Sequence, residues 1–294
     1  MESSSDVTTS IINTINTIFD KMFSSIDEKL YEVLDDLTFI GSNILDDKHF
    51  GKILGTSTTN GILLIANALL IGFLLYFAIK YLFSNFTYTR IENPIQFIFK
   101  IIIFAILMNS SYFIIEKILD LNYNICSAIR GLGEDLFNEE ICFNNLIKTI
   151  NKNLEIDKGS FDIFSVDGLI KGTLTISLLN LVLSYSLRYI MIKVFIILSP
   201  FAFISLCLEN TSWFFKSWYR NLFSLLFIQI IVSIVIVILF STNYSSNDLL
   251  TKFIYIGGIY VLIKANSIAR EFMMGSGIST NIQGNMNIGK VLGK

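Results

Sequence analysis

The chain has 294 residues, of which 53% are hydrophobic and 16% are charged, and its formal net charge is −2. A soluble globular protein usually carries about 25% charged residues. The missing charges leave two long uncharged runs, at 53–79 and 221–247, both rich in Leu, Ile, Phe and Val. Composition therefore excludes an ordinary soluble protein and predicts an all-α polytopic membrane protein, because uncharged runs of this length are typical of membrane-spanning helices.

The first predicted element is an amphipathic helix within residues 1–55. Apolar side chains recur every three or four residues from Ile11 to Ile40, and the opposite face is acidic. A helix that lies on anionic lipid normally carries Lys and Arg on its polar face. Contact with a protein partner, or packing on the outer membrane surface, is therefore favoured over direct lipid binding. Ordinary packing against the helix bundle stays open.

About five membrane-spanning helices follow, predicted at 61–82, 94–115, 169–190, 219–241 and 252–269. A further apolar segment, 194–208, has only 15 residues. Its helical length of about 22 Å falls short of a hydrocarbon core of about 30 Å. Pro200 also interrupts it by removing a backbone donor. This segment is predicted to be broken and not to span.

The distribution of charge favours five crossings over six. Residues 1–60 carry 4 Lys and Arg against 10 Asp and Glu, and the loop at 116–167 carries 5 against 10. The connection at 188–220 and the C-terminal tail are basic. The positive-inside rule places basic segments in the cytoplasm, so the N-terminus is predicted outside the cytoplasmic membrane and the C-terminus inside.

The predicted organisation has five parts. They are an extracytoplasmic amphipathic segment at 1–55, spans one and two at 56–115, an extracytoplasmic central loop at 116–168, spans three to five at 169–270 with a broken segment at 194–218, and a flexible cytoplasmic tail at 271–294.

Span three carries the most polar side chains. Five of them are spaced 4, 3, 4 and 4 residues apart and therefore share one helical face: Thr173, Ser177, Asn180, Ser184 and Arg188. Small polar residues on one face commonly hold helices together in membranes. The alternative is a wetted surface that lines a conduit or a subunit interface.

The broken segment and the residues after it contain one of the two prolines and both tryptophans. Indole rings favour the headgroup level of a membrane, so Trp213 and Trp218 are predicted to be interfacial anchors that set the entry angle of span four. A non-spanning helix at membrane depth must be covered by protein or line a cavity.

This pattern resembles the TrbL/VirB type of polytopic inner-membrane subunit of type IV secretion and conjugative transfer systems. The plan of an amphipathic N-terminal helix, five spans, a large external loop and an inward C-terminus is similar too. A departure is Glu209-Asn210, where a second proline is expected. The residues that carry the resemblance are Ser199, Pro200, Phe201, Ala202, Thr211, Trp213 and Trp218.

The resemblance implies a channel or platform subunit without catalysis or a cofactor. It implies an oligomer whose partners are other membrane subunits, the secretion ATPase and membrane lipid, with nucleic acid only as part of a passing DNA–protein substrate. The alternative is a stand-alone exporter of small solutes or peptides. The sequence contains no HExxH, GxSxG or P-loop motif, and its single histidine, His49, is not a metal site.

The three cysteines differ in their predicted surroundings. Cys207 lies in the apolar broken segment and is expected to behave as a small hydrophobic residue. Cys126 and Cys142 are 16 residues apart in the predicted external loop, where a disulfide is chemically permitted. The apolar residues of the same loop allow small helices that do not need the bond.

Overall fold

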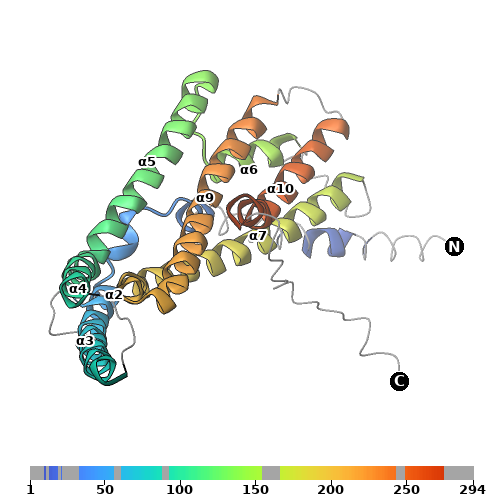
Figure 1. Cartoon of the computed structure of the whole chain (residues 1–294). Coiled ribbons are helices and arrows are strands. Elements are labelled where there is room, and N and C mark those ends of the chain that lie inside the picture. The colour runs from blue at the N-terminus through green and yellow to red at the C-terminus, as the bar shows by residue number, and fades with distance from the viewer. Residues whose placement is uncertain are drawn as a thin grey trace, which may run out of the picture.

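The computed structural model describes residues 10, 13–18, 21, 33–55, 61–87, 93–153, 166–242 and 249–274. Within those ranges the protein is helical and has no strand (Figure 1). Much of the predicted amphipathic helix and most of the predicted tail lie outside the described residues. The longer helices are α3 (Gly61–Thr87), α4 (Pro94–Asn109), α5 (Ser111–Phe137), α7 (Val166–Ile197), α9 (Ser212–Ser241) and α10 (Leu249–Met274).

Three of these helices, α3, α7 and α9, are long and apolar enough to cross a membrane. Helices α4 and α5 meet at an angle of 55° and supply a fourth candidate if they are counted as one bent span. The described part of the chain is therefore an all-helical, multi-pass membrane protein with three to four candidate spans. The predicted fifth span corresponds to α10, which is not among these candidates.

Helix α9 is the centre of the larger half of the molecule. It packs along α5 on one side and along α10 on the other, and α10 in turn packs on α7 (Figure 1). The two helices α9 and α10 approach closely at Gly258, where an added Cβ would lie 2.4 Å from a methyl carbon of Leu239. We refer to α5, α7, α9 and α10 as the main bundle.

The first part of the segment predicted as a central loop, 116–168, is helical and belongs to the 27-residue helix α5. The helix is amphipathic, because Ile115, Leu119, Asn122 and Cys126 are buried against the rest of the protein. Its charged residues lie mostly on the outer face and lower the hydropathy that indicates a span. Helix α6 (Phe143–Asn153) follows and also packs against α9.

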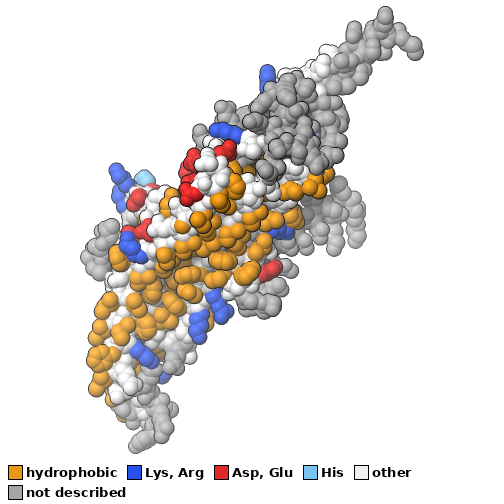
Figure 2. Space-filling model, turned by 90° about the horizontal axis from the view of Figure 1, so that it is seen from above, with side chains coloured by type: hydrophobic (Ala, Val, Ile, Leu, Met, Phe, Trp, Pro, Cys, Tyr) orange, Lys and Arg blue, Asp and Glu red, His pale blue; other side chains and the backbone are white. Residues whose placement is uncertain are grey.

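Helices α3 and α4 form a hairpin at one end of the molecule (Figure 1). Only 11% of the apolar window of α3 is buried, whereas 56% of that of α9 is. The hairpin is held by Phe77 and Phe97, whose rings stack at 3.6 Å between centroids. Hydrophobic side chains continue from this end in a broad band along one face (Figure 2), which is the surface that a membrane protein exposes to lipid.

Two short helical segments complete the fold. Helix α8 (Ser199–Ile204) follows α7 directly and packs among α3, α4, α5 and α9, so the segment 194–208 is broken and covered by protein. Helix α2 (Lys48–Leu54) precedes α3 and packs on it. The remaining short turns are the 3-10 helices η1 (Ser42–Leu45), η3 (Ser205–Cys207) and η4 (Glu209–Thr211).

Candidate functional site

Residues 33–45 occupy a buried position among α5, α6, α7 and α9. Residues 33–38 are helical and are followed by η1. Leu34, Thr38, Ile40 and Ile44 are at most 3% exposed. This part of the N-terminal segment is therefore packed inside the protein, as in the alternative that the sequence left open.

Arg188 of α7 holds the end of this helical turn. It is 1% exposed, and its Nη2 donates hydrogen bonds to the carbonyl oxygens of Leu37, at 3.1 Å, and of Thr38. The last carbonyls of a helix have no donor within that helix, and a cation beside them is favourable. No ion pair joins Arg188 to a carboxylate among the described residues, and its Nε and Nη1 have no hydrogen-bond partner there.

Gln229 of α9 connects the same segment to α5. Its Nε2 donates to the carbonyl of Ile40 at 3.3 Å, and its Oε1 accepts from Nδ2 of Asn122 at 2.7 Å. The hydroxyl of Ser233 donates to the Gln229 carbonyl at 2.9 Å, and the thiol of Cys126 is hydrogen-bonded to the Ser233 side chain. We call Asn122, Cys126, Arg188, Gln229 and Ser233 the polar cluster.

Asp35 joins residues 33–45 to α6. Its carboxylate accepts hydrogen bonds from the backbone N–H groups of Phe143, at 3.0 Å, and Asn144, at 3.4 Å, at the start of that helix. A carboxylate is favourable at this position because the first N–H groups of a helix lack internal partners. Burial nevertheless raises the pKa of Asp35, since desolvation outweighs the backbone hydrogen bonds and the nearby charge of Arg130.

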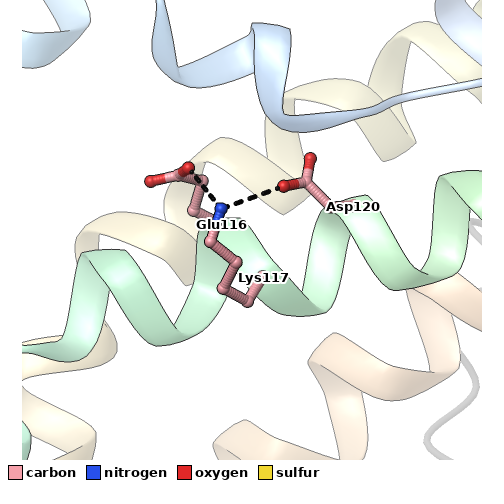
Figure 3. Close-up of polar contacts among 3 residues, drawn as sticks. All are labelled: Glu116, Lys117 and Asp120. Carbon is pink, nitrogen blue, oxygen red and sulfur yellow. Dashed lines mark hydrogen bonds and ion pairs between the residues drawn. The ribbon is translucent and has the colours of Figure 1, made fainter.

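The outer face of α5 lies at the edge of the same region. Lys117 is bridged to Glu116 at 3.0 Å and to Asp120 at 3.4 Å, with all three side chains partly exposed (Figure 3). Exposed ion pairs of this kind contribute little to stability, typically about 0–1 kcal/mol. Asp120 is also hydrogen-bonded by Ser42, so this face contacts the end of segment 33–45 without closing the polar cluster.

Asp47 and Lys193 are in contact, with 3.4 Å between Oδ2 and Nζ. The ammonium of Lys193 also lies 5.0 Å from the ring centre of Phe50. The charge distribution had placed residues 1–60 outside and Lys193 inside, about 30 Å apart across the hydrocarbon core. The two placements cannot both be correct, because the contact puts Asp47 and Lys193 at one level.

The predicted polar face of span three is divided in the structure. Thr173 and Asn180 are exposed, Ser177 and Ser184 are half-buried, and Arg188 is fully buried. Five residues with this spacing drift around the helix by about 60° over four turns, which is enough to carry the last of them to the buried side. Of the first four, Thr173 and Asn180 are fully available to lipid or to another subunit, and Ser177 and Ser184 only in part.

The broken segment is stabilised by side-chain donors. Pro200 lacks the N–H that would bond to the Ile196 carbonyl in a continuous helix, and the hydroxyl of Ser199 donates to that carbonyl at 2.7 Å instead. Nε1 of Trp218 donates to the neighbouring carbonyl of Phe195 at 2.7 Å. The hydroxyl of Thr211 donates to the carbonyl of Ser205 at 2.6 Å and so fixes the turn before α9.

The two tryptophans therefore have different environments. Trp213 is 66% exposed, as expected of an interfacial anchor. Trp218 is 4% exposed and packs against Phe203 and Phe215. Trp218 was also predicted to be an interfacial anchor; in the structure its indole N–H has a buried carbonyl partner, Phe195, that only the folded chain brings near.

The three cysteines are free and buried. Cys126 faces Ser233, while the sulfur of Cys142 accepts a hydrogen bond from the N–H of Asn145 at 3.4 Å, at the start of α6. The permitted disulfide between Cys126 and Cys142 is not formed, since each sulfur has a different partner on a different helix. Cys207 is buried in the hydrophobic core, as expected of a cysteine that behaves as a hydrophobic residue.

Of the polar cluster, the sequence had singled out Arg188 as part of a polar face and Cys126 as half of a disulfide. Asn122 was missed because it lies in a segment taken for a loop. The described residues contain no group of three or more His, Cys, Asp or Glu that could hold a metal ion. No protein-family model matches the chain, and no curated protein and no solved structure matches it significantly.

Proposed function

We propose that this protein is a structural channel or platform subunit of a conjugative type IV secretion system. The observation that carries the proposal is the broken segment. Helix α8 is a short apolar helix that begins directly after α7 with Pro200 in its first turn, packs against α3, α4, α5 and α9, and is followed by the long helix α9. This is the feature on which the resemblance to the TrbL/VirB type of subunit rests.

The exposed polar side of α7 supports a role in an assembly. Asn180 is exposed, and its side chain has no hydrogen-bond partner among the described residues. An amide that faces lipid gains from a partner on another helix. The proposed partners are further copies of this chain, other membrane subunits and the secretion ATPase, with a DNA–protein substrate passing through the assembly.

The test is plasmid transfer from a donor strain with an in-frame deletion of the gene. Transfer should be lost on deletion and restored by the intact gene. A Trp218→Phe allele, which removes the donor to the broken segment, should reduce transfer, whereas Trp213→Phe should not. Unchanged transfer after deletion would remove the proposal and leave export of a small solute or peptide, which solute accumulation would test.

The polar side of α7 can be tested separately. Single cysteines at Ser177, Asn180 and Ser184 would be probed with a water-soluble thiol reagent in a background without Cys207. Labelling in the assembled complex indicates a wetted surface, and uniform protection indicates a helix interface. The exposed Leu183, which lies beside this face, is the control position for contact with lipid.

The contact between Asp47 and Lys193 adds a proposal on topology. We retain the basic connection at 188–220 on the cytoplasmic side, which places residues 33–55 at the cytoplasmic level of the bundle. A cysteine at the exposed Lys48 should then react with an impermeant reagent in inverted membrane vesicles and not in intact cells. The reverse result would place this end of α7 outside.

A further inference from the structure

We propose that residues 33–45 are a plug that closes a passage for polypeptide between α5, α7 and α9, and that they leave this position when the passage opens. The inference rests on the proposed function and deepens it by locating the path and the class of substrate. Its first support is the origin of the contacts. Arg188 of α7 and Gln229 of α9 donate to one short segment, and Asn122 of α5 in turn donates to Gln229.

The chemistry of the contacts indicates the substrate class. Arg188 and Gln229 donate to the main-chain carbonyls of Leu37, Thr38 and Ile40, and not to side chains. Every residue of a polypeptide has such a carbonyl, so the same donors can serve successive residues of any sequence. A guanidinium also binds phosphate well, but affinity for nucleic acid comes from many such cations acting together, and the polar cluster contains only one, Arg188.

The fit of the segment is incomplete, which favours its release. Nε and Nη1 of Arg188 and Oγ1 of Thr38 are buried without a hydrogen-bond partner among the described residues. A buried polar group left unpaired costs about 1–3 kcal/mol. Those costs are relieved when water enters, so the closed arrangement is less stable than its number of contacts indicates.

Cys126 is a native reporter for the opening. It is fully buried and lies one helical turn from both Asn122 and Arg130 on α5. Asn122 is connected to Ile40 through Gln229, and the guanidinium of Arg130 lies 4.0 Å from the ring centre of Phe39. Departure of segment 33–45 therefore exposes Cys126 to water.

The segment can be locked at Gly41. A Cβ at this position would lie 3.4 Å from ring carbons of Tyr123 on α5. The φ of Gly41 is −108°, so a cysteine is unstrained there. A Gly41→Cys/Tyr123→Cys pair is therefore placed to form a disulfide. Cys142 would be replaced by Ser, while Cys126 and Cys207 would be kept.

The experiment measures labelling of Cys126 by a water-soluble maleimide in membranes of a transfer-competent donor, with mass spectrometry to resolve each site. We expect labelling at least tenfold slower in the oxidised double variant than after reduction, and no change at Cys207. Equal rates at Cys126 in the two states would overturn the plug. A parallel change at Cys207 would overturn it too, because the lock would then act on the whole bundle.

The same strains separate this inference from the proposed function. If plasmid transfer depends on the gene but the labelling rate of Cys126 is the same with and without the disulfide, the proposed secretion function stands and the plug hypothesis is overturned. If the labelling rate of Cys126 depends on the disulfide but plasmid transfer does not need the gene, the plug hypothesis stands and the proposed secretion function is overturned. A photo-activatable cross-linker at Ser233 should capture polypeptide in the reduced state, and capture of nucleic acid alone would contradict the substrate class.

Discussion

The main bundle and the α3–α4 hairpin are both built from apolar helices, yet they are stabilised differently. In the main bundle, α9 is largely buried, and its residues Trp218, Gln229 and Ser233 make hydrogen bonds, whereas the hydroxyl of the buried Ser224 has no partner among the described residues. In the hairpin, α3 is mostly exposed, and Asn67 and Asn109 bond reciprocally through their amides at 3.3 and 3.4 Å. Hydropathy alone does not distinguish the two, because lipid and a protein interior are similarly apolar. Buried polar contacts do.

The largest expected effect is at Trp218. Its replacement by Ala should lower the free energy of unfolding by about 3–5 kcal/mol, because the change leaves a cavity and an unpaired Phe195 carbonyl. The exposed Trp213→Ala is the matched control and should change it by less than about 0.5 kcal/mol. Denaturant unfolding in detergent would measure both. Similar losses of unfolding free energy for the two variants would show that burial in the main bundle does not determine how much each tryptophan contributes to stability.

The adjacent glycines of α10 give a smaller and sharper contrast. Gly258→Ala places a methyl group against Leu239 of α9 and should cost about 1–3 kcal/mol through overpacking. Nothing lies within 4 Å of the corresponding position at Gly257. Gly257→Ala should therefore be neutral or stabilise the helix by up to about 1 kcal/mol. Thermal unfolding of the two variants tests whether α9 and α10 are as close as described.

The hairpin should show a weaker coupling. A double-mutant cycle with Asn67→Ala and Asn109→Ala should give an interaction energy of about 0.6 kcal/mol, the typical value for hydrogen bonds between helices in membranes. The cycle would be measured by unfolding in bicelles. An interaction energy above about 2 kcal/mol would show that the hairpin, like the main bundle, is stabilised strongly by polar contacts between its helices.

The smallest effect concerns pH and Asp35. Because burial raises its pKa above the ordinary value of 3.8, the folded state holds the proton more tightly than the unfolded state. The resulting stability is complete below pH 3.8 and is lost as the pH rises through the raised pKa. The difference in stability between the wild type and Asp35→Asn should fall across that window and be flat above it. A difference that grows with pH would show that the carboxylate is favoured where it lies.

The sequence predicted the features that depend on local composition. It indicated a helical membrane protein, the long apolar helices and the break near Pro200, since runs of apolar residues and a proline act within a few residues of their position. It did not predict the partners of Arg188, because the carbonyl of Thr38 is 150 residues away in the sequence. Helix α5 was missed because a hydropathy average does not separate its buried face from its charged one.

The bond between Trp218 and the Phe195 carbonyl also bears on how the protein folds. The two residues are 23 positions apart, on opposite sides of the break. The Phe195 carbonyl gains this donor only when α9 packs beside the end of α7, and a buried polar group left unpaired costs about 1–3 kcal/mol. The end of α7 is therefore completed by the docking of α9, which makes the two helices one unit of folding.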